Sequence, residues 1–179
     1  LQPLLASDKD SCQALMNEEW LAKRVVSQYV PQVLPLSIGK RSHLYYVMTW
    51  HEGTTIQERI DSGHHFTVVG TAKIGVDLMR ALGVLHRLNI VHRDIKPANI
   101  HLGLDQRLRI LDLGVALNAS TGSVETMQNP GTPSFMSPEL FEGVVANASS
   151  DIYAAGVALY HMLTRRYPYG EIEPFQTPR

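Results

Sequence analysis

The segment VHRDIKPANI, residues 91–100, gathers five ionisable or amide side chains around one proline and between apolar residues. In this segment Asp94 can accept a proton from a hydroxyl, Lys96 can neutralise phosphate charge, and Asn99 offers an oxygen to a hard cation. Asp112, in ILDLG, adds a second carboxylate at the expected end of a strand. Because Asn99 and Asp112 are oxygen ligands suited to Mg²⁺ with a bound phosphate, the set favours phosphoryl transfer.

Apolar residues recur at helical spacing in three segments that must position this chemistry. The segments are residues 13–26, 70–89 and 150–164. The first carries on one face Leu15, Glu18, Ala22 and Val26, and the second carries Ile74, Leu78, Ala81, Leu82 and Leu85. The third is mostly apolar, which predicts a buried helix, and Ser149 or Ser150 is its expected N-cap.

Strand signals are shorter and lie on both sides of the reactive segment. Residues 43–50 are rich in aromatic and β-branched side chains and predict a strand, followed by a connector at 51–55. Residues 100–102 and 108–111 predict two short strands around the turn GLDQ. Residues 115–135 are polar and aperiodic, and a loop of this length inside a domain is usually functional.

Composition limits the class of protein. The formal net charge of −1 argues against a nucleic-acid partner, because such proteins usually carry a basic excess. The single cysteine excludes a disulfide framework within the chain. No run of about 18 apolar residues occurs, so no membrane segment is expected in this chain.

Five segments in chain order resemble the eukaryotic-like Ser/Thr protein kinase family, and the resemblance covers nearly the whole chain. They are YYVMTWHEGTTI (45–56) for the last small-lobe strand and hinge, HRDIKPANI (92–100) for the catalytic loop, DLG (112–114) for the metal-binding element, GTPSFMSPE (131–139) for the substrate-docking segment and SDIYAAGVALYHML (150–163) for the central helix of the large lobe. Two positions depart from the usual pattern, Leu113 in place of Phe and Ser137 in place of Ala.

The resemblance implies a bilobal α+β fold and a protein kinase that transfers the γ-phosphoryl group of Mg-ATP to Ser or Thr of a protein substrate. It assigns Asp94 as the catalytic base and Lys96 as the group that steadies the phosphoryl group. Asn99 and Asp112 become the ligands of Mg²⁺. A lysine two residues after the aspartate is the pattern of Ser/Thr kinases.

Further roles are implied in the same way. The ATP-binding and hinge residues are Met48, Thr49, Trp50, His51 and His101, and the substrate-docking residues are Thr132, Phe135 and Met136. Thr132 is expected to hydrogen-bond near Asp94 and Lys96, and Asp151 is expected to brace the catalytic loop. The other supporting residues are His92, Arg93 and Glu139, and the candidate phosphosites are Ser120, Thr121, Ser123 and Thr126.

The resemblance also predicts how the chain divides. Residues 1–48 correspond to a partial small lobe, 49–53 to the hinge, and 54–179 to a large lobe without its last helices. Glu18 is expected to pair with an ATP-contacting lysine, but this lysine and the Gly-rich loop would lie before Leu1. The fragment as printed is therefore not expected to bind ATP normally.

Two alternatives to an active kinase stay open. A pseudokinase, acting as a scaffold on the same fold, is disfavoured because Asp94, Lys96, Asn99 and Asp112 are all retained. A small-molecule phosphotransferase is disfavoured because GTPSFMSPE resembles a peptide-docking element. The segments NEEWLAKRVVSQYV and YPYGEIEPFQTPR resemble bacterial kinase domains fused to a metal-dependent protein phosphatase, which would place the catalytic domain in the cytoplasm with any membrane anchor outside this chain.

Several side chains keep two interpretations. His101 occupies a position that is usually apolar in the family, and either stacks under the adenine ring or fills space. Arg93 is either a surface charge or the partner of a phosphorylated loop, and the hydroxyls proposed as phosphosites are explained equally well by loop solubility. His92 is expected to be a packed structural imidazole. Glu139 resembles a buried glutamate of the family whose arginine partner lies further along the chain, and a buried glutamate without a partner would be costly.

Overall fold

The computed structural model describes residues 9–36, 44–113, 116–118 and 132–172. The α-helices are α1 (Lys9–Arg24), α2 (Ile56–Asp61), α3 (Val68–Arg87), α4 (Pro138–Phe141) and α5 (Ala148–Thr164), and short 3₁₀ turns cover Pro97–Asn99 and Pro133–Phe135. The strands are β1 (Val33–Leu34), β2 (Val47–Met48), β3 (Gly53–Thr55), β4 (Ile90–Val91), β5 (Ile100–Gly103), β6 (Leu108–Ile110) and β7 (Leu117–Asn118). They pair antiparallel as β1–β2, β3–β5–β6 and β4–β7. This mixed α and β architecture is consistent with the expected protein kinase fold.

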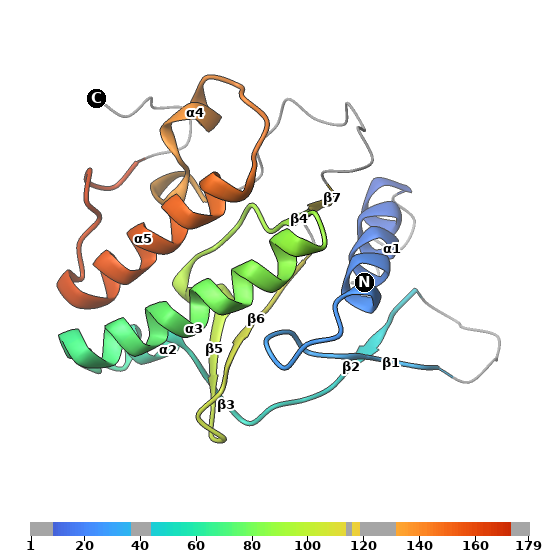
Figure 1. Ribbon diagram of the computed structural model, residues 1–179, viewed down its shortest axis with the longest axis horizontal. Helices are drawn as coiled ribbons and strands as arrows, with labels where there is room; N and C mark the ends of the chain where they lie inside the picture. The colour runs from blue at the N-terminus through green and yellow to red at the C-terminus, as the bar shows by residue number, and fades with distance from the viewer. Residues whose placement is uncertain (1–8, 37–43, 114–115, 119–131, 173–179) are drawn as a thin grey trace.

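Helices α3 and α5 pack side by side and form the largest part of the core (Figure 1). The predicted stripe on α3 is confirmed: Leu78, Ala81, Leu82 and Leu85 are buried, and Ile74 is partly buried. On α5 the small side chains of Ala155 and Ala158 are fully buried, which lets the two helices approach closely. The predicted burial of the third helix is therefore confirmed for its core face.

The sheet β3–β5–β6 lies between this helical pair and the pocket described below. The two predicted short strands around GLDQ are confirmed as β5 and β6, with Ile100 opposite Ile110 and both fully buried. One residue further along β5, His101 lies opposite Thr55 of β3 and Arg109 of β6. Since neighbouring residues of a strand point to opposite faces, this register directs Ile100 to the core and His101 away from it.

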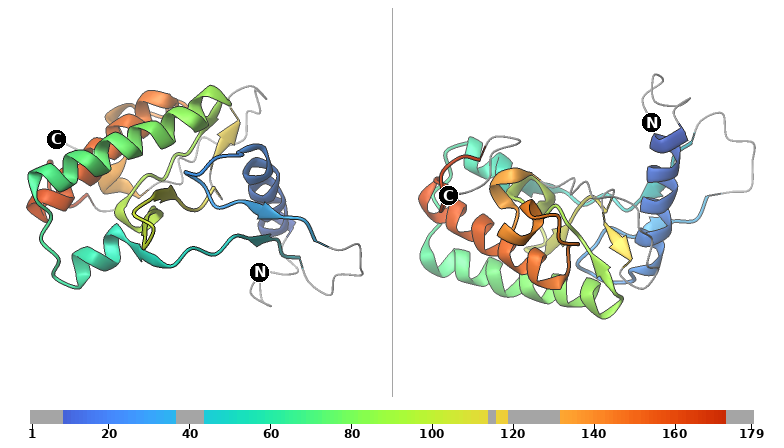
Figure 2. Two further views of the ribbon diagram at one scale, coloured as in Figure 1. Left: turned by 60° about the horizontal axis from the view of Figure 1, so that its bottom comes forward. Right: turned by 90° about the horizontal axis from the view of Figure 1, so that it is seen from above.

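Helix α1 stands with β1 and β2 at the other end of the molecule (Figure 2). Leu21 and Ala22 near its carboxyl end are buried, and so is Val25, the first residue after the helix. The prediction that Val26 shares this face is wrong, because the helix ends at Arg24 and the Val26 side chain is 84% exposed. Helix α1 therefore begins earlier and ends earlier than the helix predicted over residues 13–26.

Three other boundaries differ from the sequence-based expectation. The strand predicted over 43–50 is limited to Val47–Met48, the two residues that pair with β1. The predicted connector at 51–55 ends in β3, because Gly53–Thr55 hydrogen-bonds to β5. Helix α5 starts earlier than expected, with Asn147 as its N-cap: its side chain accepts a hydrogen bond from Ser149 N at 2.8 Å, and Ser150 Oγ accepts one from Asn147 N at 3.3 Å.

Candidate active site

The loop between β4 and β5 is anchored by the side chain of Asp151, which is only 1% exposed. Asp151 lies in the first turn of α5 and accepts hydrogen bonds from the backbone N–H groups of His92 and Arg93, both at 2.9 Å. The Nε2 atom of His86, on α3, lies 2.8 Å from the same carboxylate. Arg93 has a left-handed backbone with φ of 69°, so the bond to its N–H stabilises a strained residue.

His92 joins this loop to the segment that carries Asp112. Its imidazole is fully buried, as expected for a packed structural group. The N–H of Asp94 donates to His92 Nδ1 at 3.3 Å, so the ring proton resides on Nε2, which lies 3.0 Å from the carbonyl oxygen of Leu111. The neutral ring therefore uses both nitrogens to hold the loop beside the end of β6.

The Asp94 carboxylate is held on both of its oxygens. Oδ1 accepts hydrogen bonds from the backbone N–H of Thr132 at 3.2 Å and from its hydroxyl at 3.1 Å. Oδ2 accepts from Asn99 Nδ2 at 3.1 Å and forms an ion pair with Lys96 Nζ at 2.7 Å. Lys96 Nζ also donates to Thr132 Oγ1 at 3.0 Å. Residues 38 positions apart in the sequence thus meet around one carboxylate.

Lys96 reaches Asp94 because of the backbone between them. Lys96 is extended, with φ of −155° and ψ of 164°, before the 3₁₀ turn that starts at Pro97. Residues two apart on an extended chain point to the same side, so the two side chains can pair.

Asn99 and Asp112 are brought together by the first residues after β6. The backbone N–H of Leu111 donates to the Asn99 carbonyl oxygen at 2.9 Å, so the next residue, Asp112, follows directly beside Asn99. Asn99 Nδ2 is also bonded to the Asp94 carbonyl oxygen at 2.8 Å, which leaves Oδ1 as its cation-binding atom. Asp112 has a left-handed backbone with φ of 62° and an exposed side chain.

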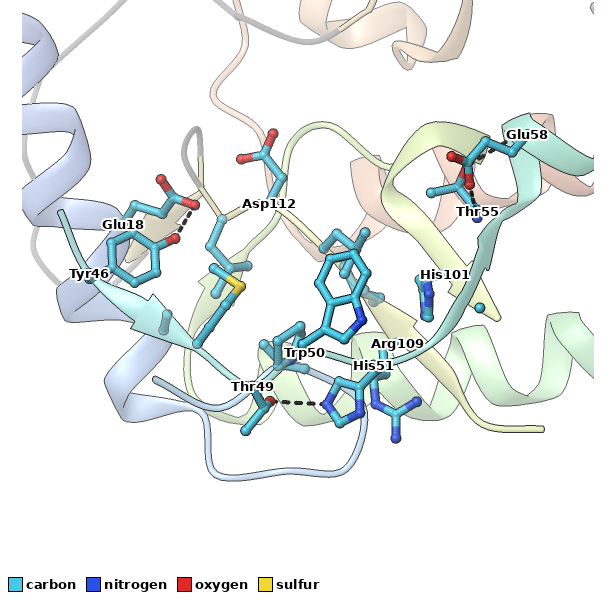
Figure 3. Close-up of a pocket in the computed structure, with 18 residues that line it drawn as sticks. Glu18, Tyr46, Thr49, Trp50, His51, Thr55, Glu58, His101, Arg109 and Asp112 are labelled. Atoms are coloured by element: carbon cyan, nitrogen blue, oxygen red, sulfur yellow. Dashed lines mark hydrogen bonds between the residues drawn. The ribbon is translucent and has the colours of Figure 1, made fainter. Parts of the chain in front are cut away.

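A pocket of about 450 Å³ lies between α1, the segment after β2, and the sheet β3–β5–β6 (Figure 3). This volume is in the range of small-molecule and cofactor sites. Its lining includes the five residues predicted to bind ATP, namely Met48, Thr49, Trp50, His51 and His101. Two acidic residues of the prediction, Glu18 and Asp112, also line it. Trp50 is 87% exposed at the rim, and Thr49 Oγ1 lies 3.0 Å from His51 Nε2.

Tyr46 is a pocket residue that the sequence reasoning did not single out. Its hydroxyl donates to Glu18 Oε1 at 2.6 Å and so links the residue just before β2 with α1 (Figure 3). Burial raises the pKa of Glu18 above its ordinary value, the bond from Tyr46 lowers it, and the negative charge of Asp112 adds to the increase. The alternation of side chains along the predicted strand places Tyr46 on one face with Met48, but nothing in it identifies Glu18 as the partner.

Arg109 and Asp105 form a second missed pair, beneath the pocket. Arg109 is 4% exposed, and its guanidinium binds Asp105 with two contacts, Nη2 to Oδ2 at 2.7 Å and Nη1 to Oδ1 at 3.1 Å. The hydrogen bond from Arg109 holds the pKa of Asp105 well below its usual range. The four-residue spacing across the turn is a weak signal that the sequence reasoning did not use.

The segment 132–139 continues from the Asp94 site into the core of the large helical part. Phe135 is buried and packs edge to face on Tyr167, with ring centroids 5.5 Å apart. Met136 is partly buried against Val91 and Leu140. The structure thus directs Phe135 and Met136 inward, whereas Thr132 contacts Asp94.

Glu139 is less buried than the resemblance implies, and it has two hydrogen-bond partners. Glu139 is partly exposed and accepts hydrogen bonds from Ser137 Oγ at 2.7 Å and Ser150 Oγ at 3.2 Å. The bond from Ser137 is the main reason that the pKa of Glu139 is lowered. The serine that departs from the family pattern therefore supplies a partner for this carboxylate.

Other sequence-based expectations lie partly beyond this geometry. The candidate phosphosites Ser120, Thr121, Ser123 and Thr126 lie outside the described residues. Arg93 is partly buried, and its Nε has no hydrogen-bond partner among the described residues. In that same part of the chain no three His, Cys, Asp or Glu side chains gather as a metal site. Among the described helices none is both long and apolar enough to cross a membrane.

The fold and the loop geometry define a kinase-type catalytic domain. Residues 4–177 match the family model described as "Protein kinase domain", and the chain therefore belongs to the protein kinase family.

Curated relatives agree with this assignment. The chain is 35% identical over 128 residues to a probable serine/threonine-protein kinase of Streptomyces coelicolor, covering 70% of this chain and 19% of the relative. It is 36% identical over 134 residues to the probable serine/threonine-protein kinase PknB of Corynebacterium glutamicum, covering 73% and 21%. The serine/threonine-protein kinase PkaA of S. coelicolor is 31% identical over 174 residues, covering 95% and 32%. The chain thus spans about a fifth of the first two relatives.

Proposed function

We propose that this chain is part of the catalytic domain of a protein serine/threonine kinase that transfers the γ-phosphoryl group of Mg-ATP to a protein hydroxyl. The observation that carries the proposal is the Asp94 carboxylate held by Thr132, Asn99 and Lys96. A positioned carboxylate beside a lysine and a cation-binding amide is the equipment that phosphoryl transfer needs. The relatives named as serine/threonine kinases support the substrate hydroxyl.

In this proposal each side chain has a separate task. Asp94 receives the proton of the attacking hydroxyl, and its four contacts fix the direction in which its oxygens point. Lys96 stabilises the charge of the transferring group, and Thr132 couples the docking segment to both residues. His86, His92 and Asp151 touch no reacting atom and act by positioning the loop.

The residues present also fit a magnesium ion with its nucleotide. Mg²⁺ is usually held by one or two protein carboxylates together with substrate phosphates and water. Asn99 Oδ1 and the exposed carboxylate of Asp112 would supply the protein ligands. The bound ion would neutralise the charge that accumulates on the phosphate oxygens.

We expect the Asp112→Ala variant to lose Mg-dependent nucleotide affinity by more than about tenfold, because it removes the carboxylate of the proposed pair. Calorimetry of ATP binding to the full-length protein, with and without magnesium, measures the effect. Asp61→Ala, at the exposed end of α2, is the matched control. Equal affinities of the two variants in magnesium would remove Asp112 from the metal site.

The nucleotide would occupy the pocket of Figure 3, with residues 49–53 as the hinge between a partial small lobe (1–48) and a large lobe (54–179). Met48, Thr49, Trp50 and His51 would border the base. Glu18 would pair with an ATP-contacting lysine before Leu1, and its present bond to Tyr46 keeps its carboxylate in the pocket. Phosphorylation of Ser120, Thr121, Ser123 or Thr126, with Arg93 donating hydrogen bonds to the phosphate, belongs to the same proposal.

The wider arrangement of the whole protein is also a proposal. It includes a cytoplasmic location of the domain and a fused metal-dependent phosphatase with a membrane anchor outside this chain. The transfer of a radiolabelled γ-phosphoryl group from ATP by the full-length protein tests the activity. Label on Ser or Thr of a substrate protein is the expected result, and nucleotide binding without any transfer would establish the pseudokinase alternative.

A further inference from the structure

Three rings meet at the segment that begins with Thr132. Phe135 ends the 3₁₀ turn Pro133–Phe135 and is buried. Tyr167, in the segment that follows α5, packs on Phe135 with the ring planes at 82°. His161, in the last turn of α5, stacks on Tyr167 with centroids 4.6 Å apart and lies edge to face to Phe135 at 6.4 Å. Such aromatic pairs stabilise the position of a buried ring beyond its burial alone.

A second contact joins the same two segments. The backbone N–H of Ile172 donates to Ser134 Oγ at 3.1 Å. The segment after α5 turns back along the helix (Figure 1), and so it contacts the 3₁₀ turn at both Ser134 and Phe135. The two contacts use different side chains of the turn, so each can be removed by substitution while the other is kept.

The 3₁₀ turn links the position of Phe135 to that of Thr132. The N–H of Phe135 donates to the Thr132 carbonyl oxygen at 2.9 Å, and residues three apart in a 3₁₀ turn lie one above the other. Thr132 in turn donates to Asp94 Oδ1 from its backbone N–H and from its hydroxyl. A shift of the Phe135 ring therefore moves the residue that holds the Asp94 carboxylate.

The pocket of Figure 3 is built from other parts of the chain. Its lining residues all lie between Glu18 and Leu113. The turn at 133–135 and the segment 161–172 are described by the structure and contribute no residue to this lining. A change confined to the three rings is therefore expected to leave nucleotide binding intact.

We propose that Tyr167 is a positioning residue for the docking of the protein substrate. Its ring holds Phe135, and with it the turn that begins at Thr132, while His161 fixes the plane of the Tyr167 ring. A segment already held in one conformation loses less freedom when a peptide binds to it, so these contacts increase the affinity for the protein substrate. The inference rests on the proposed kinase function, and it adds that the segment after α5 controls protein affinity separately from nucleotide affinity.

The test measures transfer of a radiolabelled γ-phosphoryl group by the full-length protein to dephosphorylated casein, a serine-rich protein. The values of KM for casein and kcat are determined for Tyr167→Leu, which removes the ring, and for Tyr167→Phe, which keeps it. Ser134→Ala removes the second contact and leaves all three rings in place. Tyr160→Leu, at an exposed position of α5, is the matched control. Calorimetry measures the ATP affinity of each variant.

We expect KM for casein to rise about fivefold or more in Tyr167→Leu and about threefold in Ser134→Ala. Tyr167→Phe and the Tyr160→Leu control should keep the KM of the unaltered protein, because the ring contacts do not need the hydroxyl. ATP affinity should be the same in all the variants. If Tyr167→Leu does not fold, Ser134→Ala and Tyr167→Phe decide the outcome.

A fall of kcat without a rise of KM for casein would overturn the inference, because loss of folded protein alone has that effect. A parallel loss of ATP affinity would overturn it as well, since the rings would then support the fold as a whole. ATP binding without any transfer by the unaltered protein would overturn the proposed function. The failure of the inference and the failure of the proposed function are thus distinguishable.

Discussion

The Asp94→Asn variant is expected to lose phosphoryl transfer by at least about a hundredfold, because general-base catalysis contributes roughly that factor or more. An amide has nearly the shape of the carboxylate but cannot take up the proton of the attacking hydroxyl. The change also places an NH₂ group against donors, since Thr132 N–H, Thr132 Oγ1–H, Asn99 Nδ2–H and Lys96 Nζ all donate to Asp94. The rate of label transfer at saturating Mg-ATP measures the loss.

Asp77→Asn is the matched control for this experiment. Asp77 is partly exposed on α3, and its contact is an ion pair with Arg80 at 3.1 Å. The control should transfer label at the rate of the unaltered protein, and circular dichroism should report the same helix content for both variants. If Asp94→Asn and Asp77→Asn transfer label equally fast, Asp94 is not the base.

The Asp151→Ala variant is expected to lose about 3 kcal/mol or more of unfolding free energy, because removing one partner of a buried polar network leaves the others unsatisfied. The change leaves the N–H groups of His92 and Arg93 and the imidazole of His86 without their acceptor. The strained Arg93 backbone also loses its anchor. Urea unfolding at constant slope measures the change in free energy.

The comparison variant is Asp77→Ala, which breaks a surface ion pair with Arg80. Such pairs contribute at most about 1 kcal/mol, so the midpoint of unfolding should move little. A similar small shift for Asp151→Ala would mean that water replaces its contacts and that Asp151 does not anchor the loop. At urea concentrations below the unfolding midpoint, where both variants are folded, phosphoryl-transfer activity should fall for Asp151→Ala alone, because the loop that carries Asp94 becomes mobile.

Local pattern was sufficient for the elements whose residues interact along the chain. The apolar stripe of α3 and the hairpin β5–β6 follow from periodicity and turn residues, and both were predicted correctly. Element boundaries that depend on a partner far away in the sequence were not predicted correctly. The strand β2 has the length of its pairing with β1, and β3 exists because β5 lies beside it.

The sequence by itself determined which reactive side chains lie close together along the chain, since the residue types and spacing in 91–100 and at Asp112 do not depend on their surroundings. Tertiary structure alone decided what each group touches. It joined Tyr46 to Glu18 and the serines to Glu139. It also set Arg109 beside His101 across the strand pair β5–β6. The physical reason is that hydrogen bonding, burial and charge depend on distances in space, which residues far apart in sequence acquire only when the chain packs.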